Sequence, residues 1–483
     1  MNIMSKIKGW WKSMFLSETE KVFGVDIASD TIMDCKIAEW MNTYKGNPVW
    51  VNSEERIRSI KFAKSICSET ARLTTLASGI EFDGSARANW LKEQCNKNVL
   101  PRLRNWVEYG CAVGTVVMKP TKSGVDLFLP GQFYIVNTGN GRVSDMVFQD
   151  TYEEGKDNRK KYYTKLERHS FMHGQVKNEK DGTYKDVVFY HIQNRAFVSA
   201  TEKSIGKEIG LEETKWSGLQ PDVYITKAND GQINTMLFGV FKMPMANDAD
   251  INSPLGVSIF SDAMEELKDL DIAYSRNAGE IKDSETIELL GNMMVNKPGT
   301  KLSKMEMNLP HHVHMVSPST DDYYQAIERP LHTDIRIQGI NQQLSFIGYK
   351  CGYSNGYFVF NEKTGMVTAT QVEADDRRTI QLIKDTRDAL QSCLDDLFYA
   401  MSVFADIYNL APVGQYKVSY DFGDIVYSYE EDKARHWQYV QAGKFPLWRY
   451  YMKFEGYSEA EAKALVSEAQ DENKDTGLFG NEE

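Results

Sequence analysis

Residues 253–291 read SPLGVSIFSDAMEELKDLDIAYSRNAGEIKDSETIELLG, and residues 330–352 read PLHTDIRIQGINQQLSFIGYKCG. In the first stretch, apolar residues recur at steps of three and four behind Ser253 and Pro254, a helix start signal. In the second stretch the same spacing follows Pro330, and Gly352 is a good C-terminal stop. The sequence therefore predicts two long amphipathic helices that flank a small strand-and-turn insertion at 292–328, with strands at 293–296 and 312–316.

A loop rich in aromatic residues and glycine, YSNGYFVFNEKTGMVT, follows at 353–368. Thr370 and Glu373 then form a capping box, which predicts a third helix that runs without a breaker to about Leu410, roughly 57 Å. Long helices with charged outer faces usually serve assembly. The loop is either an ordinary connection between helices or, as is more common at this length, a functional segment.

The N-terminal half has a different pattern. Helical periodicity covers 31–44, 54–78 and 86–109, and the period then changes to that of strands. This half is predicted to be an α+β domain with an antiparallel sheet, and 199–256 is predicted to be rich in loops. Past Pro412 we expect a strand at 416–422, two helices around Pro446 and a solvated acidic tail. The strands are expected at 113–118, 125–129, 133–136, 143–149, 162–171 and 184–198.

Composition limits the possible functions. The chain has 483 residues, of which 42% are apolar and 26% charged, and its net charge is −12. This is a globular composition, and the length suggests about three domains. An acidic chain gains no general counterion-release affinity for DNA, so any DNA contact should be weak or local. The six cysteines form no C-x-x-C pair and are expected to be reduced thiols that pack as small hydrophobic residues.

Membrane-spanning segments are not expected, because no apolar run approaches the 18 residues that a span requires. Residues 3–16, IMSKIKGWWKSMFL, can form a short basic amphipathic helix. Such a helix binds either a membrane interface or a neighbouring protein surface. Three lysines attract a membrane only weakly, so we favour the protein surface. The protein is expected to be soluble and made in a cytoplasm.

Enzymatic motifs of the P-loop, dinucleotide-binding, zincin and nucleophile-elbow types are absent from the sequence, so we expect no enzyme, no catalytic residue and no cofactor. His312 and His314 would share one face of a strand, but a metal needs further ligands, and exposed histidines are the favoured interpretation. The acidic groups Glu373, Asp375, Asp376 and Asp421, Asp424 could suggest a two-metal nuclease. The first group occupies a first helical turn, where carboxylates favour the dipole, so no metal site is predicted.

Four stretches carry a resemblance to a known family. They are PLG at 254–256, the run Ile337–Leu344, KCGYSNGYFVF at 350–360 and TATQVEADD at 368–376. With the order of elements around them, they resemble the portal protein, or head-to-tail connector, of tailed bacteriophages. The likeness is greatest to the A118-like and SPP1-like portals of Gram-positive siphophages.

The resemblance implies an α+β portal fold with an α/β wing, a long-helix stem, a small β-containing clip and a helical crown, assembled into a ring. It assigns the parts of the chain as follows: 1–256 N-terminal and wing region, 257–290 first stem helix, 291–329 clip, 330–352 second stem helix, 353–368 tunnel loop, 369–424 long wing helix and following strand, and 425–483 crown and acidic tail.

The resemblance also implies a function. Twelve copies would form a homododecameric ring at one capsid vertex of the virion, assembled in the bacterial host cytoplasm. Double-stranded DNA would pass through without sequence-specific contact during packaging and ejection. The implied partners are the major capsid protein, the scaffolding protein, the large terminase subunit, which binds transiently, and a head-completion adaptor protein; no membrane is involved. The alternative is a minor capsid or head-completion structural protein.

Three groups of residues are assigned by this resemblance. The tunnel loop would touch DNA through Asn355, Gly356, Tyr357, Phe358, Lys363 and Thr364. The clip would dock partners through Asn296, Lys297, His312 and His314. The stem helices would form the ring interface through Phe260, Met264, Leu267, Tyr274, Ile340, Leu344 and Ile347.

Overall fold

The structure of the chain is a computed structural model with helices and strands in both halves of the sequence, which confirms the α+β class. It describes residues 18–27, 31–52, 56–76, 78–121, 124–139, 141–156, 160–177, 184–202, 204–225, 233–283, 287–291, 313–316, 324–327, 332–359, 377–422, 429–442, 444–455, 457 and 461–468. The predicted N-terminal amphipathic helix at 3–16 lies outside these residues.

The chain divides into two compact units, Met1–Phe422 and Gly423–Glu483. The second unit contains α11 (Tyr429–Gln441), α12 (Leu447–Tyr450) and a π-helical turn (Tyr451–Glu455). Pro446 is the residue that precedes α12, so the predicted pair of helices around this proline is confirmed. The small core of this unit includes Tyr450, Phe454 and Ala462.

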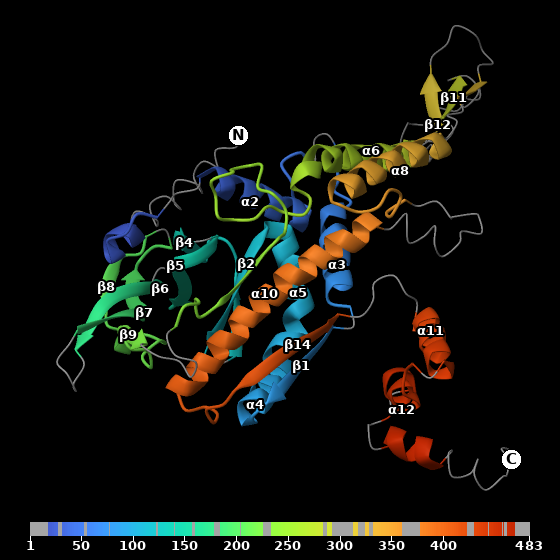
Figure 1. Cartoon of the computed structure of the whole chain (residues 1–483). Coiled ribbons are helices and arrows are strands. Elements are labelled where there is room, and N and C mark those ends of the chain that lie inside the picture. The colour runs from blue at the N-terminus through green and yellow to red at the C-terminus, as the bar shows by residue number, and fades with distance from the viewer. Residues whose placement is uncertain are drawn as a thin grey trace, which may run out of the picture. The chain divides into compact units, whose positions relative to one another are not determined.

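The longest element of the first unit is α10 (Arg377–Ile407), whose 31 residues span about 46 Å. Its predicted start at Thr370 lies outside the described residues, and its apolar face is buried as predicted. The helix ends three residues before the predicted Leu410, because Asn409 adopts a left-handed conformation with φ 51°. In Figure 1, α10 crosses the unit diagonally and is in contact with several elements of the N-terminal half.

Three helices lie near α10: α3 (Phe62–Thr74) and α4 (Ala86–Gln94) contact it, and α5 (Leu100–Val113) packs on α3. The helix predicted at 86–109 is therefore two helices, joined by a π-helical turn at Cys95–Val99. The helix predicted at 54–78 is shorter than expected. Residues before it are held in an extended conformation, because the amides of Arg58 and Ile60 donate to Ser275 and Asp271. The helix predicted at 31–44 is confirmed as α2 (Thr31–Lys45).

A six-stranded antiparallel sheet forms the core of the N-terminal half. Its order is β4-β5-β6-β7-β8, and β9 pairs with β7 beside β8. The hairpin of β6 and β7 is the longest pairing and runs from Tyr162 opposite Ser199 to Lys177 opposite Tyr184. The strands are β4 (Phe133–Gly139), β5 (Arg142–Glu154), β6 (Lys161–Lys177), β7 (Tyr184–Ser199), β8 (Lys207–Ile209) and β9 (Asp222–Ile225).

The inner face of this sheet, which we define by Met146, Phe148 and Tyr190, packs on the last turns of α10 through Ala400 and Val403. The same core includes residues of a three-stranded sheet of order β10-β2-β3, with β10 at Gly239–Lys242, β2 at Thr115–Thr121 and β3 at Gly124–Phe128. The prediction that 199–256 is mostly loop missed β8, β9 and β10. These strands have three or four residues, too few to display an alternating pattern.

The strand predicted at 416–422 is confirmed as β14 (Tyr416–Phe422), and its antiparallel partner is β1 (Ser78–Gly84). Thus β14 returns the chain to the N-terminal half. The close approach of β1 to the residues at the start of β14 requires a glycine. A Cβ on Gly84 would lie 2.6 Å from the carbonyl oxygen of Gln415, and the φ of Gly84 is +134°.

The first of the two helices flanking the insertion differs from its prediction at both ends. Observed α6 spans Met264–Asp283, and the predicted start at Ser253–Pro254 is wrong. Residues 256–260 are instead irregular and end in a turn, and the amide of Ile259 and the hydroxyl of Ser258 donate to the Cys111 carbonyl of α5. The predicted end near Gly291 is also wrong, because 287–291 is strand β11.

The second helix, α8 (Thr333–Lys350), agrees with its prediction and ends before Gly352, whose φ is +85°. In the insertion, β11 (Ile287–Gly291) pairs with β12 (Val313–Val316) in parallel and with β13 (Tyr324–Ile327) in antiparallel orientation. A strand near His312–Val316 was predicted and is confirmed. The strand predicted at 293–296 lies outside the described residues.

A buried ionic cluster lies between the two sheets. The Glu167 carboxylate accepts from the ammonium groups of Lys119 and Lys165, at 2.6 and 2.8 Å, and is 2.8 Å from Nε2 of His169. The other ring nitrogen of His169 is 2.7 Å from the Tyr190 hydroxyl. Burial alone would raise the pKa of Glu167, but the two ammonium groups hold it well below its usual range. Burial lowers the pKa of His169, so the ring is neutral.

Two buried arginines cap helix ends around α10. The Arg87 guanidinium, which is fully buried, donates to the carbonyl oxygens of Ser402, Ala411 and Pro412 at 2.6–3.0 Å and pairs with Asp406. The Ser402 carbonyl belongs to the last turns of α10 and the other two to the segment that follows it, so Arg87 holds this segment against the end of the helix. From α10 itself, Arg387 donates to the carbonyl oxygens of Leu73 and Thr74 at the end of α3.

We expect the substitution Arg87→Met to lower the free energy of unfolding by about 3–5 kcal/mol, because Asp406 and the carbonyl groups of Ser402, Ala411 and Pro412 would lose their buried donor. Urea unfolding followed by circular dichroism measures this change. The control is Arg142→Met, since the Arg142 side chain is 70% exposed and 3.9 Å from Asp396; we expect a loss below about 1 kcal/mol. Equal losses would contradict the capping role.

The buried cluster predicts a pH dependence of stability. His169 and Glu167 have lower pKa values in the folded than in the unfolded chain, so the folded state binds fewer protons and stability falls on acidification. The loss from His169 begins at about pH 6.5 and that from Glu167 at about pH 4.3. We expect His169→Gln to flatten the fall of Tm between about pH 6.5 and 5. As a control, we expect His173→Gln, at an exposed position, to leave the fall of Tm over this pH range unchanged.

Candidate functional site: the helix pair and the loop root

Helices α6 and α8 form an antiparallel pair with ion pairs at both ends. Near the start of α6, Glu266 is 2.5 Å from Lys350, the last residue of α8. At the other end, Glu280 pairs with Arg336 and accepts from the His332 amide at 3.1 Å. The strands β11, β12 and β13 follow α6 and precede α8, so this pair carries the small sheet at one end (Figure 1).

Most residues assigned to a ring interface are buried within the chain itself. Five of them are at most 9% exposed, and Met264 and Tyr274 are half-buried. The buried five therefore belong to the chain's own core, where α6 and α8 pack against each other, and are not available to a second copy in this conformation. They are Phe260, Leu267, Ile340, Leu344 and Ile347. Periodicity identifies an apolar face but not the chain that covers it.

A different set of apolar residues lies on the opposite side of α8. Ile335 is 69% exposed, Phe346 48% and Tyr349 59%. At 100° per residue, these three lie within about 60° of one another and opposite to Leu344. We call them the α8 stripe. The exposed Gly339 and Gln342 lie between them on the same side, so the stripe runs along almost the whole helix.

The part of the chain after α8, predicted as a loop at 353–368, begins as a packed structure. The Tyr353 side chain is fully buried and its hydroxyl is 2.6 Å from that of Thr70 in α3. The Ser354 amide donates to the Thr379 hydroxyl at 2.9 Å, which ties the chain to the first turns of α10. Phe358 stacks edge-on against Phe62, with centroids 5.2 Å apart. We call residues 353–359 the loop root.

The hydroxyl of Tyr357 is also engaged, because it donates to Glu69 at 2.6 Å. Glu69 accepts two further hydrogen bonds from Arg72, at 2.7 and 2.8 Å. The bonds from Arg72 and Tyr357 lower the pKa of this carboxyl, although burial opposes the shift. Tyr357 is thus positioned by α3, although 37% of its surface is exposed.

Of the six residues assigned to DNA contact, four are described. Asn355 is exposed, Gly356 forms a turn with φ +78°, Tyr357 is bound to Glu69, and Phe358 is packed against aromatic rings. Lys363 and Thr364 lie outside the described residues. The partners of the loop root, Phe62, Glu69 and Thr70, were missed, because they are nearly 290 positions away and lie in an ordinary amphipathic pattern.

Of the residues assigned to the clip, only His314 is described, and it lies in β12 opposite Leu289. Asn296, Lys297 and His312 lie outside the described residues, as do Glu373, Asp375, Asp376 and Asp424. Within the described parts of the chain, no group of three metal-ligating side chains is found. The Arg378 guanidinium lies over the ring of Tyr349 and donates to the Tyr349 carbonyl oxygen at 3.1 Å.

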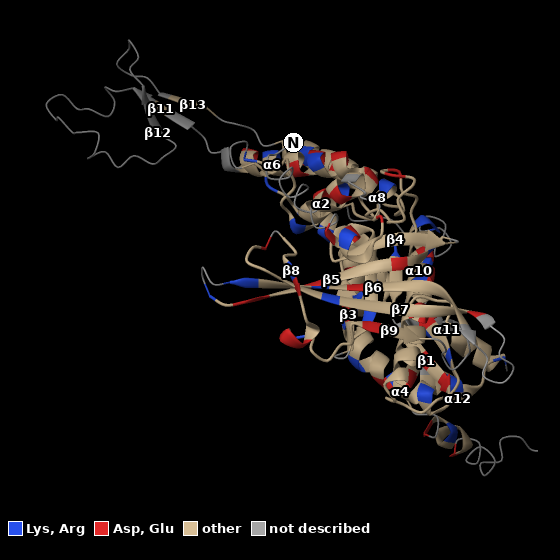
Figure 2. Ribbon diagram, turned by 90° about the vertical axis from the view of Figure 1, so that its left-hand side faces the viewer, with Lys and Arg blue, Asp and Glu red and all other residues tan. Residues whose placement is uncertain are grey.

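Charged side chains of both signs are interspersed along the described ribbon (Figure 2). This distribution lacks the clustered cations that drive general DNA affinity. Five of the six cysteines are buried free thiols and Cys35 is exposed; burial raises the pKa of Cys95 to about 12, which makes this thiol unreactive. Among the helices that the structure describes, none combines the length and apolar character needed to span a bilayer.

No family model and no curated protein matches this sequence. Among solved structures, the chain is similar to a chain in the virion of a native gene transfer agent particle, with 9% identity, a TM-score of 0.38 and coverage of 85% of this chain and 90% of that one. It is also similar to a chain in the neck of that particle, computed with C12 symmetry, with 9% identity, a TM-score of 0.37 and coverage of 87% and 98%. These scores are too low to establish a shared fold.

We expect the loop root and α3 to be energetically coupled through Phe62 and Phe358. A double-mutant cycle with Phe62→Leu and Phe358→Leu should give a coupling energy of about 0.5–1.5 kcal/mol, because the edge-to-face pair is lost only once. Urea unfolding of the two single variants and the double variant measures it. The control uses Tyr408, an exposed residue near the end of α10. We expect the changes in the free energy of unfolding caused by Tyr408→Leu and Phe62→Leu to be additive.

Proposed function

We propose that this chain is the portal protein of a tailed bacteriophage, and that copies of it form a closed ring at one capsid vertex through which double-stranded DNA is packaged and ejected. The observation that carries the proposal is the arrangement of α6, the small sheet, α8, the loop root and α10. The same order of elements underlies the resemblance at 254–256, 337–344, 350–360 and 368–376.

The α8 stripe supplies the physical reason for assembly. A single chain leaves Ile335 and Phe346 in water on the side of α8 that faces away from its own core. In a closed ring, each copy would bury this stripe against a neighbour, and no copy would leave it exposed. The ring interface of this proposal therefore consists of the α8 stripe rather than the buried apolar faces of the helix pair.

Conduction of DNA, rather than catalysis, is the proposed mechanism. A channel through which a duplex slides must avoid tight phosphate binding, and an acidic chain with interspersed cations satisfies this requirement. The chain itself would hydrolyse no ATP; that chemistry would belong to the large terminase subunit. Residues 360–376, between the loop root and α10, and the exposed Asn355 would contact the DNA without reading its sequence.

The remaining partners follow from the same arrangement. The sheet of β11, β12 and β13 is attached to the body through the two antiparallel helices, so it is the element we propose to dock the terminase and later the head-completion adaptor. The N-terminal half would contact the major capsid protein, with the scaffolding protein present during assembly. In this proposal the chain is a component of the virion.

Negative-stain electron microscopy with mass photometry on the purified chain, without DNA, tests this function. Rings of about twelve subunits are the expected result for a closed cyclic interface. A compact dimer with metal-dependent nuclease activity would overturn the proposal. Particles that join only one edge of a capsid or connector, with no ring of their own, would instead favour a minor capsid or head-completion protein.

We expect the double substitution Ile335→Asp and Phe346→Asp to abolish the rings and to shift the mass to that of single chains, because two carboxylates would be buried without partners at each interface. Mass photometry and the unfolding curve of the variant provide the measurement. The control Leu410→Asp changes an exposed apolar residue beyond the end of α10 and should leave the rings intact. Rings in both variants would show that the α8 stripe is not the interface.

A further inference from the structure

The helix pair of α6 and α8 joins the body of the first unit at one end. Just before α6, the Ile259 amide donates to the Cys111 carbonyl of α5 at 3.0 Å. Just after α8, Tyr353 of the loop root is bonded to α3. These two connections adjoin because the helices are antiparallel, with Glu266 near the start of α6 beside Lys350 at the end of α8. The pair therefore projects from one region of the body, and the small sheet follows at its far end.

A second attachment holds α6 part-way along its length. It is made by residues 56–61, which lead into α3 and which we call the strap, together with Trp50. The Asp271 carboxylate accepts from the Ile60 amide at 2.8 Å and from the indole N–H of Trp50 at 2.9 Å. Asp271 is only 4% exposed, and burial raises its pKa, although the two bonds oppose this shift. Both donors are neutral, so the strap carries a negative charge into the interior without a described cation beside it, which is costly.

The strap makes a further contact one turn along α6. The Arg58 amide donates to the Ser275 hydroxyl at 2.8 Å, and this hydroxyl is 2.7 Å from the Asp271 carbonyl oxygen. The Arg58 guanidinium lies over the ring of Tyr274, 5.5 Å from its centroid. At 1.5 Å per residue, these contacts lie about 10–17 Å from the first residue of α6, and the helix continues for about another 12 Å to Asp283. The strap is thus a second support, well away from the end at which the pair joins the body.

The backbone of the strap is strained at both ends. Arg56 has φ 55° and Lys61 has φ 58°, a left-handed conformation that residues other than glycine seldom adopt. The side chain of Lys61 lies over Gly46, where a Cβ would be 2.5 Å from it. Strain of this kind persists only where the surrounding contacts maintain it. Two strained residues and one desolvated carboxylate therefore oppose the hydrogen bonds that hold the strap on α6.

We propose that the strap is a latch with two states: its bonds to Asp271 and Ser275 hold the helix pair at one angle to α3, and their loss lets the pair pivot about its attached end. In the released state, Arg56 and Lys61 adopt ordinary backbone conformations and the Asp271 carboxylate is hydrated. Because the pair carries the α8 stripe and the small sheet, the latch determines the direction in which both point. The inference concerns one chain and does not depend on the proposed function.

The distance between two spin labels tests the latch. Asn105→Cys on α5 and Gln338→Cys on α8 place the labels at exposed positions, in a Cys35→Ser background, and labelled chain is diluted with unlabelled chain. We expect Asp271→Asn to broaden the distance distribution at least about twofold, because an amide nitrogen cannot accept either of the two bonds. The control Asp269→Asn removes an exposed carboxylate from the same helix and should leave the distribution unchanged.

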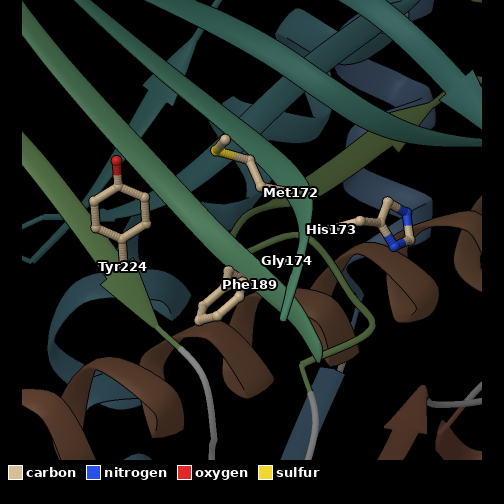
Figure 3. Close-up of a pocket in the computed structure, with 5 residues that line it drawn as sticks. All are labelled: Met172, His173, Gly174, Phe189 and Tyr224. Carbon is tan, nitrogen blue, oxygen red and sulfur yellow. The ribbon is translucent and has the colours of Figure 1, made fainter. Parts of the chain in front are cut away.

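A milder variant guards against misfolding. Trp50→Phe keeps an aromatic ring and removes only the indole N–H, and we expect it to broaden the distribution and to speed exchange of the Ile60 amide at least about fivefold. The matched control is Tyr224→Phe, which removes the hydroxyl from a ring that is 58% exposed and lines a hollow with Met172 and Phe189 (Figure 3). It should change neither quantity. Distributions that stay narrow in both strap variants, even with a lower Tm, would overturn the latch, as would equal broadening in the controls.

Discussion

The buried guanidinium groups of Arg87 and Arg387 are the contacts on which the first unit depends. A helix as long as α10 can shift along its axis unless its ends are fixed, because an apolar stripe packs almost equally well one turn further on. Arg87 removes this freedom at the C-terminal end by taking three carbonyl oxygens, and Arg387 ties the middle of the helix to the end of α3. Guanidinium groups suit this role, since their planar fork donates in several fixed directions.

With α10 fixed, its first turns position the loop root. Thr379 accepts from the Ser354 amide, and α3, which Arg387 holds, supplies Phe62, Glu69 and Thr70 to the same root. The root is thus attached to two elements that are themselves attached to each other. Whatever residues 360–376 do, they start from and return to points that the body of the molecule determines. The buried Glu167 cluster rigidifies the sheet in a comparable way, at the cost of desolvating four ionisable groups.

Local pattern was sufficient for the elements that bury one continuous face. Helices α2, α8 and α10 and the β6–β7 hairpin agree with their predictions, because their periodicity extends over many residues. It failed where a distant segment decides the conformation. Residues 256–260 have helical spacing, yet the hydrogen bonds to the Cys111 carbonyl and the close approach of Gly256 to Gly114 hold them outside a helix. The contacts of the loop root could not be predicted for the same reason. The partners of its tyrosine hydroxyl groups are in α3, and no local pattern in the sequence points to them.

A local pattern also does not show which segment covers an apolar face, and for this reason most residues assigned to the ring interface are found in the chain's own core. Periodicity indicates that a face of α8 is apolar, and the larger apolar face is buried within the chain itself, where α8 packs against α6. The narrower α8 stripe has three apolar residues separated by Gly339 and Gln342, so it reads as a polar surface in the sequence. The exposed fraction of each side chain in the folded chain distinguishes the two faces, because it counts only the surface that the chain's own packing leaves accessible to solvent. The α8 stripe remains apolar and exposed after the chain has folded, and this is why we propose that a further copy covers it.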